Sequence, residues 1–77
     1  TMIMKGRQTH VGFVSKVNPL VDHDGLFVIM IRRMGFIPIA RSNVPQGCKT
    51  IETNNNIFGY SKNPWNLERS CGGSSGG

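Results

Sequence analysis

The sequence predicts an α/β fold, in which a helix, a short strand and a second helix follow one another through tight connections. Three observations predict it: an apolar run between Asp24 and Gly35, a second apolar stretch at residues 36–40, and the segment RSNVPQ directly after it. The chain has 77 residues. A chain of this length buries only about 60–65% of its unfolded surface, so we expect one small domain at most or a piece of a larger domain.

The first predicted helix spans residues 24–35. The Asp24 carboxylate can accept backbone N–H bonds at a helix start, and Gly35 suits the left-handed residue just past a helix end. Arg32 and Arg33 would complement the helix dipole. A strand is the alternative, because the run is rich in β-prone residues, but its length and end signals favour a helix. Its apolar residues nearly surround the axis, so we expect burial on most sides: Leu26, Phe27, Val28, Ile29, Met30, Ile31 and Met34.

The predicted strand occupies residues 36–40. It is short, apolar and β-branched, which is typical of a strand covered on both faces. Pro38 indicates that one backbone N–H is not needed by a central ladder. A second helix is then expected, with Ser42 or Asn43 as its cap and Pro45 in its first turn.

The two ends of the chain lack a clear period. Residues 1–21 are expected to form mostly loop with a short extended segment. From Thr53 onward turn-forming residues recur every few positions, which predicts a long loop without secondary structure. Its interspersed aromatics favour an ordered, functional loop, with Trp65 buried as a plug that anchors it. His10 and His23 have no partner at ligand spacing, so both are expected to be solvated.

The composition narrows the possible partners and compartments. The net charge of +5 would suit an RNA or an anionic membrane surface, but the basic residues are scattered, so we expect no nucleic-acid partner. The longest apolar run, residues 26–31, is too short to span a membrane, and membrane association stays open. Cys48 and Cys71 form no CxxC motif, which favours two free thiols in a reducing intracellular compartment.

The order and spacing of short motifs along the chain resemble those of the amidase signature family. Within that family the sequence is most similar to the fatty-acid amide hydrolase branch. GGSSGG alone is also found in flexible linkers, and its spacing from NPWN makes it specific. The matching pieces are at residues 5–6, 12, 35, 38, 43–46, 55, 58–59, 63–66 and 72–77.

The resemblance implies a mixed-sheet α/β/α domain and a serine amidase that acts on small-molecule amides without a cofactor or metal. Catalysis would use a Ser–Ser–Lys relay, because a serine hydroxyl needs an adjacent base and a desolvated neutral lysine can serve as one. The resemblance assigns the relay serine to Ser74, with a cis peptide bond after Gly73. Ser75 would support it with a second hydroxyl. We expect residues 72–77 to form an ordered turn, anchored by Trp65 and Leu67.

The resemblance also implies a substrate pocket and the positions of the other catalytic groups. Cys48, Thr50 and Ile51 fall where the hydrolase branch lines its pocket, although Lys49 stands where an apolar residue is usual. The catalytic lysine is expected just before residue 1 and the nucleophile beyond residue 77, and Lys5 is not that lysine.

Taken alone, the chain is therefore expected to be an inactive fragment of an amidase. Its partners would be the remainder of the parent domain or other chains of an assembly. The alternative is a truncated or degenerate amidase-like segment that serves as a structural component of a larger assembly. In either case we expect exposed apolar surface and low stability of the isolated chain.

Overall fold

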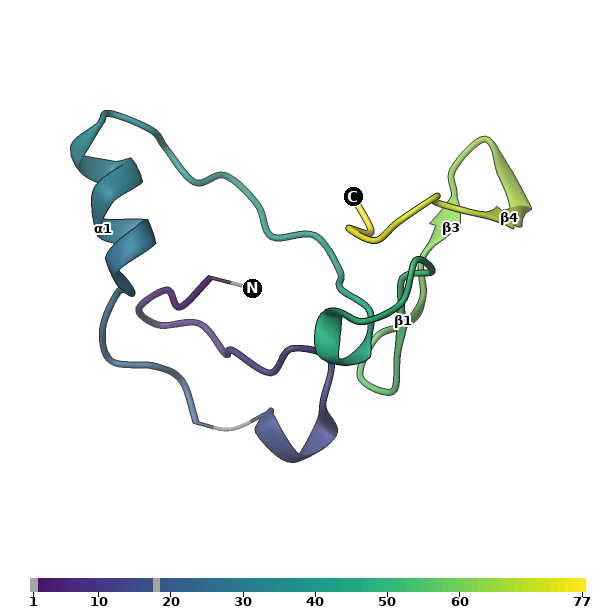
Figure 1. The fold of residues 1–77 in the computed structure, drawn as a ribbon, viewed down its shortest axis with the longest axis horizontal. Helices are drawn as coiled ribbons and strands as arrows, with labels where there is room; N and C mark the ends of the chain where they lie inside the picture. The colour runs from purple at the N-terminus through teal and green to yellow at the C-terminus, as the bar shows by residue number, and fades with distance from the viewer. Residues whose placement is uncertain (1, 18) are drawn as a thin grey trace.

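The computed structural model describes residues 2–17 and 19–77 (Figure 1). The prediction of mostly loop at residues 1–21 is confirmed for the residues that the structure describes. Thr1 and Asn18 lie outside the described residues. The Cα trace measures 40 × 30 × 18 Å along its principal axes. In chain order the elements are the 3-10 turn η1 (Val14–Lys16), the helix α1 (Leu26–Arg33), the 3-10 turn η2 (Gln46–Cys48), and the strands β1 (Asn54–Asn55), β2 (Gly59–Tyr60), β3 (Lys62–Asn63) and β4 (Asn66–Ser70).

The predicted first helix is confirmed as α1, with shorter bounds than residues 24–35. Gly35 has a φ of 88°, the left-handed conformation expected just past a helix end. Its N–H donates to the carbonyl of Arg32, and the N–H of Phe36 donates to the carbonyl of Ile31. These bonds satisfy carbonyls that would otherwise lack partners at the C-terminus of α1.

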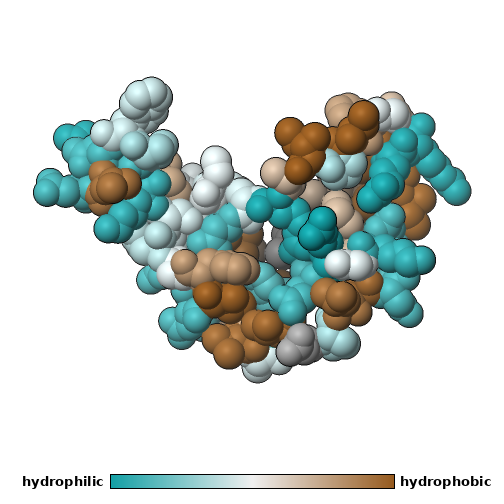
Figure 2. Space-filling view, turned by 180° about the vertical axis from the view of Figure 1, so that it is seen from behind, coloured by the Kyte–Doolittle hydropathy of each residue, from teal (hydrophilic) through white to brown (hydrophobic). Residues whose placement is uncertain are grey.

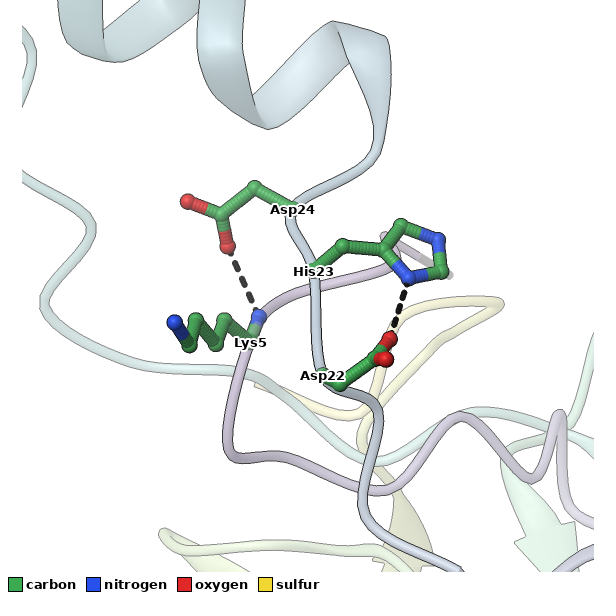
Figure 3. A network of polar contacts seen from close by, with 4 residues as sticks. All are labelled: Lys5, Asp22, His23 and Asp24. Carbon is green, nitrogen blue, oxygen red and sulfur yellow. Dashed lines mark hydrogen bonds and ion pairs between the residues drawn. The ribbon is translucent and has the colours of Figure 1, made fainter.

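The predicted cap at Asp24 is wrong. Gly25 is the N-cap residue and makes no side-chain cap bond. The Asp24 carboxylate points instead at the N-terminal segment, where Oδ1 accepts the backbone N–H of Lys5 at 2.7 Å (Figure 3). Its Oδ2 lies 3.4 Å from Nε of Arg32. This carboxylate therefore links the N-terminal segment to α1.

The prediction that α1 is buried on most sides is also wrong, because Val28 is its only buried residue. The methionines expected in the core, Met30 and Met34, are 52% and 68% exposed. The physical reason is that none of the described helices and strands packs broadly over α1. Figure 2 shows apolar patches on the molecular surface. The large apolar side chains that are exposed on and after α1 are Leu26, Phe27, Met30, Met34, Phe36, Ile37 and Ile39.

The predicted strand at residues 36–40 does not form. The segment runs extended between α1 and η2, and no described segment pairs with it (Figure 1). Ile37 and Ile39, on one face, are 82% and 91% exposed, and Phe36, on the other, is 62% exposed, so neither face is covered. A strand is defined by its ladder, and extended backbone without a neighbour is left as loop.

The second predicted helix is wrong as well. Only the single turn η2 forms, with Pro45 as its N-cap residue rather than inside its first turn. Gly47 and Cys48 both have positive φ, 67° and 55°, so the chain turns away from an α-helical path at once.

The chain from Thr53 onward forms two short antiparallel pairs, so the predicted loop without secondary structure is wrong. β1 pairs with β2, and β3 pairs with β4 with an irregular register. Trp65 lies in the turn between β3 and β4 and is 95% exposed, and Leu67 is 66% exposed. Neither residue is the anchor that the sequence predicted, because both are exposed to solvent.

One small helix with antiparallel strand pairs is consistent with the predicted α/β class. The prediction of exposed apolar surface is confirmed. Among residues 2–17 and 19–77, no helix has the length and apolar character to cross a membrane.

Candidate functional site

The candidate site is the turn at residues 72–77, which folds back from β4 toward the middle of the molecule (Figure 1). Three of its glycines lie where a side chain would collide with the rest of the chain. A Cβ on Gly73 would overlap the carbonyl oxygen of Ile51, and Gly73 has a φ of 58°. A Cβ on Gly76 would lie 2.6 Å from both Ser61 Oγ and Thr53 Cγ2, and one on Gly77 would meet Ser42. Glycine is required here by close packing.

Ser74 is held by its backbone at the centre of this turn. Oγ1 of Thr53 donates a 2.7 Å hydrogen bond to the Ser74 carbonyl, and Thr53 is fully buried. Two residues further on, the N–H of Gly76 donates to the carbonyl of Asn43 at 2.9 Å. The peptide bond between Gly73 and Ser74 is cis, as the resemblance implied. The expectation of a defined turn is therefore confirmed, with a different anchor from the one predicted.

Two asparagines form the polar core beneath the turn. Asn55 is 3% exposed, and its Nδ2 donates to Oδ1 of Asn43 at 2.6 Å and to the carbonyl of Val44 at 2.7 Å. Asn43 in turn donates from Nδ2 to Oγ of Ser61 at 3.0 Å. Asn43, whose backbone carbonyl accepts the N–H of Gly76, is thus fixed through its own side chain. Buried amides need such partners, because an unpaired buried polar group is costly.

The segments around Thr53, Ser61 and Cys71 lie side by side. The N–H of Ser61 donates to the carbonyl of Thr53 at 2.9 Å, and the N–H of Cys71 donates to the carbonyl of Ser61 at 3.3 Å. The Cys71 sulfur also lies 3.4 Å from Thr53 Oγ1. Cys71 and Cys48 are both free thiols, as predicted. This arrangement brings the start of the turn next to the residue that holds Ser74.

The predicted pocket residues Cys48, Thr50 and Ile51 are all exposed. Ile51 is brought to the turn, since its carbonyl lies against Gly73. Thr50 donates from Oγ1 to the carbonyl of Glu52, and Cys48 ends η2. The three residues therefore share one exposed segment, of which the Ile51 end adjoins the turn at residues 72–77.

An open hollow of about 950 Å³ lies beside the turn. Ser75 lines it, together with side chains from the N-terminal segment and from residues 38–44. Arg7 and Arg41 contribute positive charge, and no carboxylate is among the lining residues. Ser75 and not Ser74 faces this hollow, so the two serines of the turn have different surroundings.

His10 is not solvated, contrary to the sequence-based expectation. It is 7% exposed, and its Nδ1 accepts the N–H of Gly12 at 3.0 Å. Its ring packs against Phe58 with centroids 5.4 Å apart. Because Nδ1 accepts a hydrogen bond, the neutral ring carries its own proton on Nε2. His10 was missed because a lone histidine carries no periodic signal, and Phe58, which packs against its ring, is distant in sequence.

Two pKa shifts occur at the surface. The hydrogen bond from His23 lowers the pKa of Asp22, helped by backbone hydrogen bonding and the charge of His23 (Figure 3). His23 is an exposed residue, as predicted. The hydrogen bond to Glu52 raises the pKa of Tyr60, with burial as the next contribution. Residues 2–17 and 19–77 contain no cluster of three or more metal-ligating side chains.

Sequence reasoning gave no role to Thr53, Asn55 or Ser61. Asn43 and Asn55 stand inside motifs that were noted, but motif position does not say which side chains are buried. Thr53 and Ser61 flank the β1–β2 pair. Thr53 contacts Ser74, 21 positions further along the chain, and Ser61 contacts Gly76, 15 positions further along. Only the fold shows these contacts.

Comparison with known proteins identifies the family of this chain. The family model described as Amidase matches residues 2–77. The chain is 39% identical over 74 residues to fatty-acid amide hydrolase 2-B of Danio rerio and 40% identical over 74 residues to an acetamidase of Emericella nidulans. Each alignment covers 96% of this chain. The chain therefore belongs to the amidase family, which confirms the resemblance.

The matched region is a small part of these relatives. The chain spans 14% of the length of the hydrolase and of the acetamidase. A third relative, 6-aminohexanoate-cyclic-dimer hydrolase of Paenarthrobacter ureafaciens, is 45% identical over 56 residues, which cover 73% of this chain and 11% of that protein. No solved structure matches the chain.

Proposed function

We propose that this chain supplies the relay-serine turn of a serine amidase that hydrolyses carboxylic amides, fatty-acid amides among them. The observation that carries the proposal is the position of Ser74, which is exposed while Thr53 holds its carbonyl at 2.7 Å. A relay residue needs both properties, because its hydroxyl must be reachable while its backbone stays in place. The parent domain in this proposal is a mixed-sheet α/β/α domain.

In the proposed reaction a serine of the parent protein attacks the amide carbonyl carbon. Its proton passes to the Ser74 oxygen while the Ser74 proton passes to a neutral lysine, so that Ser74 ends with one proton as it began. The reverse transfer protonates the leaving amine as the carbon–nitrogen bond breaks. Water then hydrolyses the acyl-serine ester through the same relay. The lysine and the nucleophile come from parts of the parent protein outside residues 1–77, and Ser75 adds a hydroxyl beside the relay.

The acyl group of the substrate would lie along Cys48, Thr50 and Ile51. Two observations support this part of the proposal. The Ile51 side chain is 78% exposed, and its carbonyl contacts the glycine that precedes Ser74. The relatives include both a fatty-acid amide hydrolase and an acetamidase by name, so the length of the acyl group is the property to test.

The experiment is Ser74→Ala in the parent protein. We expect turnover to fall by about 10²- to 10⁴-fold, because a positioned proton-transfer group is removed, while the thermal unfolding midpoint stays the same. Ser15→Ala, at an exposed serine in η1, is the matched control and should keep full turnover. Assays on a short and a long acyl amide, repeated with Ile51→Ser, test the pocket: only the KM for the long amide should rise. Unaltered turnover of Ser74→Ala would contradict the relay.

The exposed apolar surface on α1 and residues 36–40 also fits the alternative, a structural component held in a larger assembly through this face. That alternative predicts a parent protein that folds but hydrolyses no amide. Turnover by the parent that depends on Ser74 excludes it.

A further inference from the structure

We infer that Thr53 is a positioning residue for the proton relay, holding the Ser74 peptide through its hydroxyl; this inference rests on the proposed function. Thr53 has no exposed surface, and its Oγ1 lies 2.7 Å from the Ser74 carbonyl oxygen. The bonded carbonyl follows directly after the Cα that carries the Ser74 side chain. Fixing it therefore limits where the Ser74 hydroxyl can lie.

The direction of this hydrogen bond follows from the chemistry of its partners. A carbonyl oxygen only accepts, so the single hydroxyl proton of Thr53 must point at Ser74. The Thr53 lone pairs are then left for the Cys71 thiol, whose sulfur lies 3.4 Å away. The thiol can donate its one proton there, whereas the Ser75 carbonyl is more distant at 4.0 Å. The bonds thus run in one direction, from Cys71 through Thr53 to Ser74.

Thr53 is itself fixed on two sides. Its carbonyl accepts the N–H of Ser61 at 2.9 Å, which ties it to the neighbouring strand segment. Its methyl carbon packs beneath Gly76, where an added Cβ would lie only 2.6 Å away. The methyl and the hydroxyl of Thr53 therefore contact two different points of the same turn. Valine keeps the methyl contact and removes the hydroxyl, and serine does the reverse.

The expected effect is on turnover and not on substrate binding. Without the Thr53 hydroxyl the Ser74 carbonyl loses its partner, and the peptide can rotate toward solvent. A displacement of about 1 Å in a catalytic group can reduce the rate by about 10²-fold. Thr53 is buried and reaches no substrate, so KM should not change.

The test uses the parent protein with Thr53→Val, Thr53→Ser and the control Thr9→Val, each assayed below its own unfolding transition. Thr9 is a suitable control because its hydroxyl is buried without a hydrogen-bond partner in the described part of the chain. We expect Thr53→Val to lower kcat by about 10- to 100-fold with unchanged KM. Thr53→Ser should recover most of this loss, and Thr9→Val should keep the kcat of the unmodified protein.

The inference, but not the proposed function, would be overturned by full kcat of Thr53→Val in a protein that Ser74→Ala inactivates, or by equal loss in Thr53→Val and Thr53→Ser. A kcat that only follows the folded fraction of each variant would also overturn it, because the role would then be structural. If Ser74→Ala itself keeps full turnover, the proposed function fails, and the inference fails with it.

Discussion

The helical region, residues 26–40, differs from the polar region, residues 43–77, in how far its side chains are buried and have partners. In the polar region, buried Thr53 and Asn55 have their hydrogen-bond partners within the same region. In the helical region only Val28 is buried, and most of the large apolar side chains face solvent. The buried polar side chains of the polar region therefore have their partners within that region, whereas most apolar side chains of the helical region have no cover.

The difference has a physical origin. A hydrogen bond needs one partner at the right distance, which a short loop can provide. An apolar side chain needs a whole surface to cover it, which usually comes from elements distant in sequence. The comparison teaches that the geometry of the turn at residues 72–77 is carried by polar contacts within residues 43–77, whatever covers α1. Three predictions test this contrast.

The largest effect is expected for Asn55→Ala in the parent protein. The substitution removes the acceptor of two backbone N–H groups, of Ile57 and Phe58, and the donor to Asn43 Oδ1 and to the Val44 carbonyl. The unfolding free energy should fall by about 2–4 kcal/mol, as measured by urea denaturation. Asn56→Ala, at the exposed neighbouring residue, is the control and should change it by less than about 0.5 kcal/mol. Equal effects of the two variants would contradict the polar core.

A smaller effect is expected for Ile39→Ser, which should act differently in the isolated chain and in the parent protein. Ile39 is 91% exposed, so in the isolated chain the substitution should not lower the thermal midpoint. It should reduce the binding of a dye that reports exposed apolar surface. In the parent, where we propose that this face is covered, it should cost about 1.5–3 kcal/mol of stability.

Val28→Ala provides the opposite control for that experiment, because Val28 is buried in the chain itself. It should destabilise the chain and the parent alike. A sharp, cooperative unfolding transition of the isolated chain without dye binding would show that the helical region needs no cover.

The smallest effect concerns Tyr60, which tests whether the polar region keeps its hydrogen bonds in the isolated chain. Tyr60 is the single tyrosine, so its ionisation can be followed by absorbance. Its hydrogen bond to Glu52 raises the pKa, and Glu52→Gln should return the midpoint toward the ordinary value. Because the folded pKa is raised, the contribution to stability is present below the unfolded pKa of about 10 and is lost as pH rises through the folded value. An ordinary midpoint in the unmodified chain would contradict the prediction.

The outcome of the sequence-based predictions depends on whether the contacts involved are local or distant in the sequence. The helix at residues 26–33 and the left-handed Gly35 were predictable, because the length of the apolar run and a C-terminal glycine are signals contained within a few positions. The strand at residues 36–40 was not, because β-branched residues form a strand only beside a partner, and none of the described segments provides one. Trp65 failed as an anchor for a similar reason, since its large apolar ring has no surface to cover it.

By itself the sequence determined the family, the place of the glycine-rich turn and the identity of Ser74 as the relay candidate, because these depend on which residues stand at which spacing. Only the tertiary structure decided that His10 is buried, that Trp65 is exposed and that Thr53 holds the Ser74 carbonyl. Those facts depend on contacts between residues far apart in the chain, such as Thr53 and Ser74, and no local pattern of residue types specifies which buried hydroxyl meets which carbonyl.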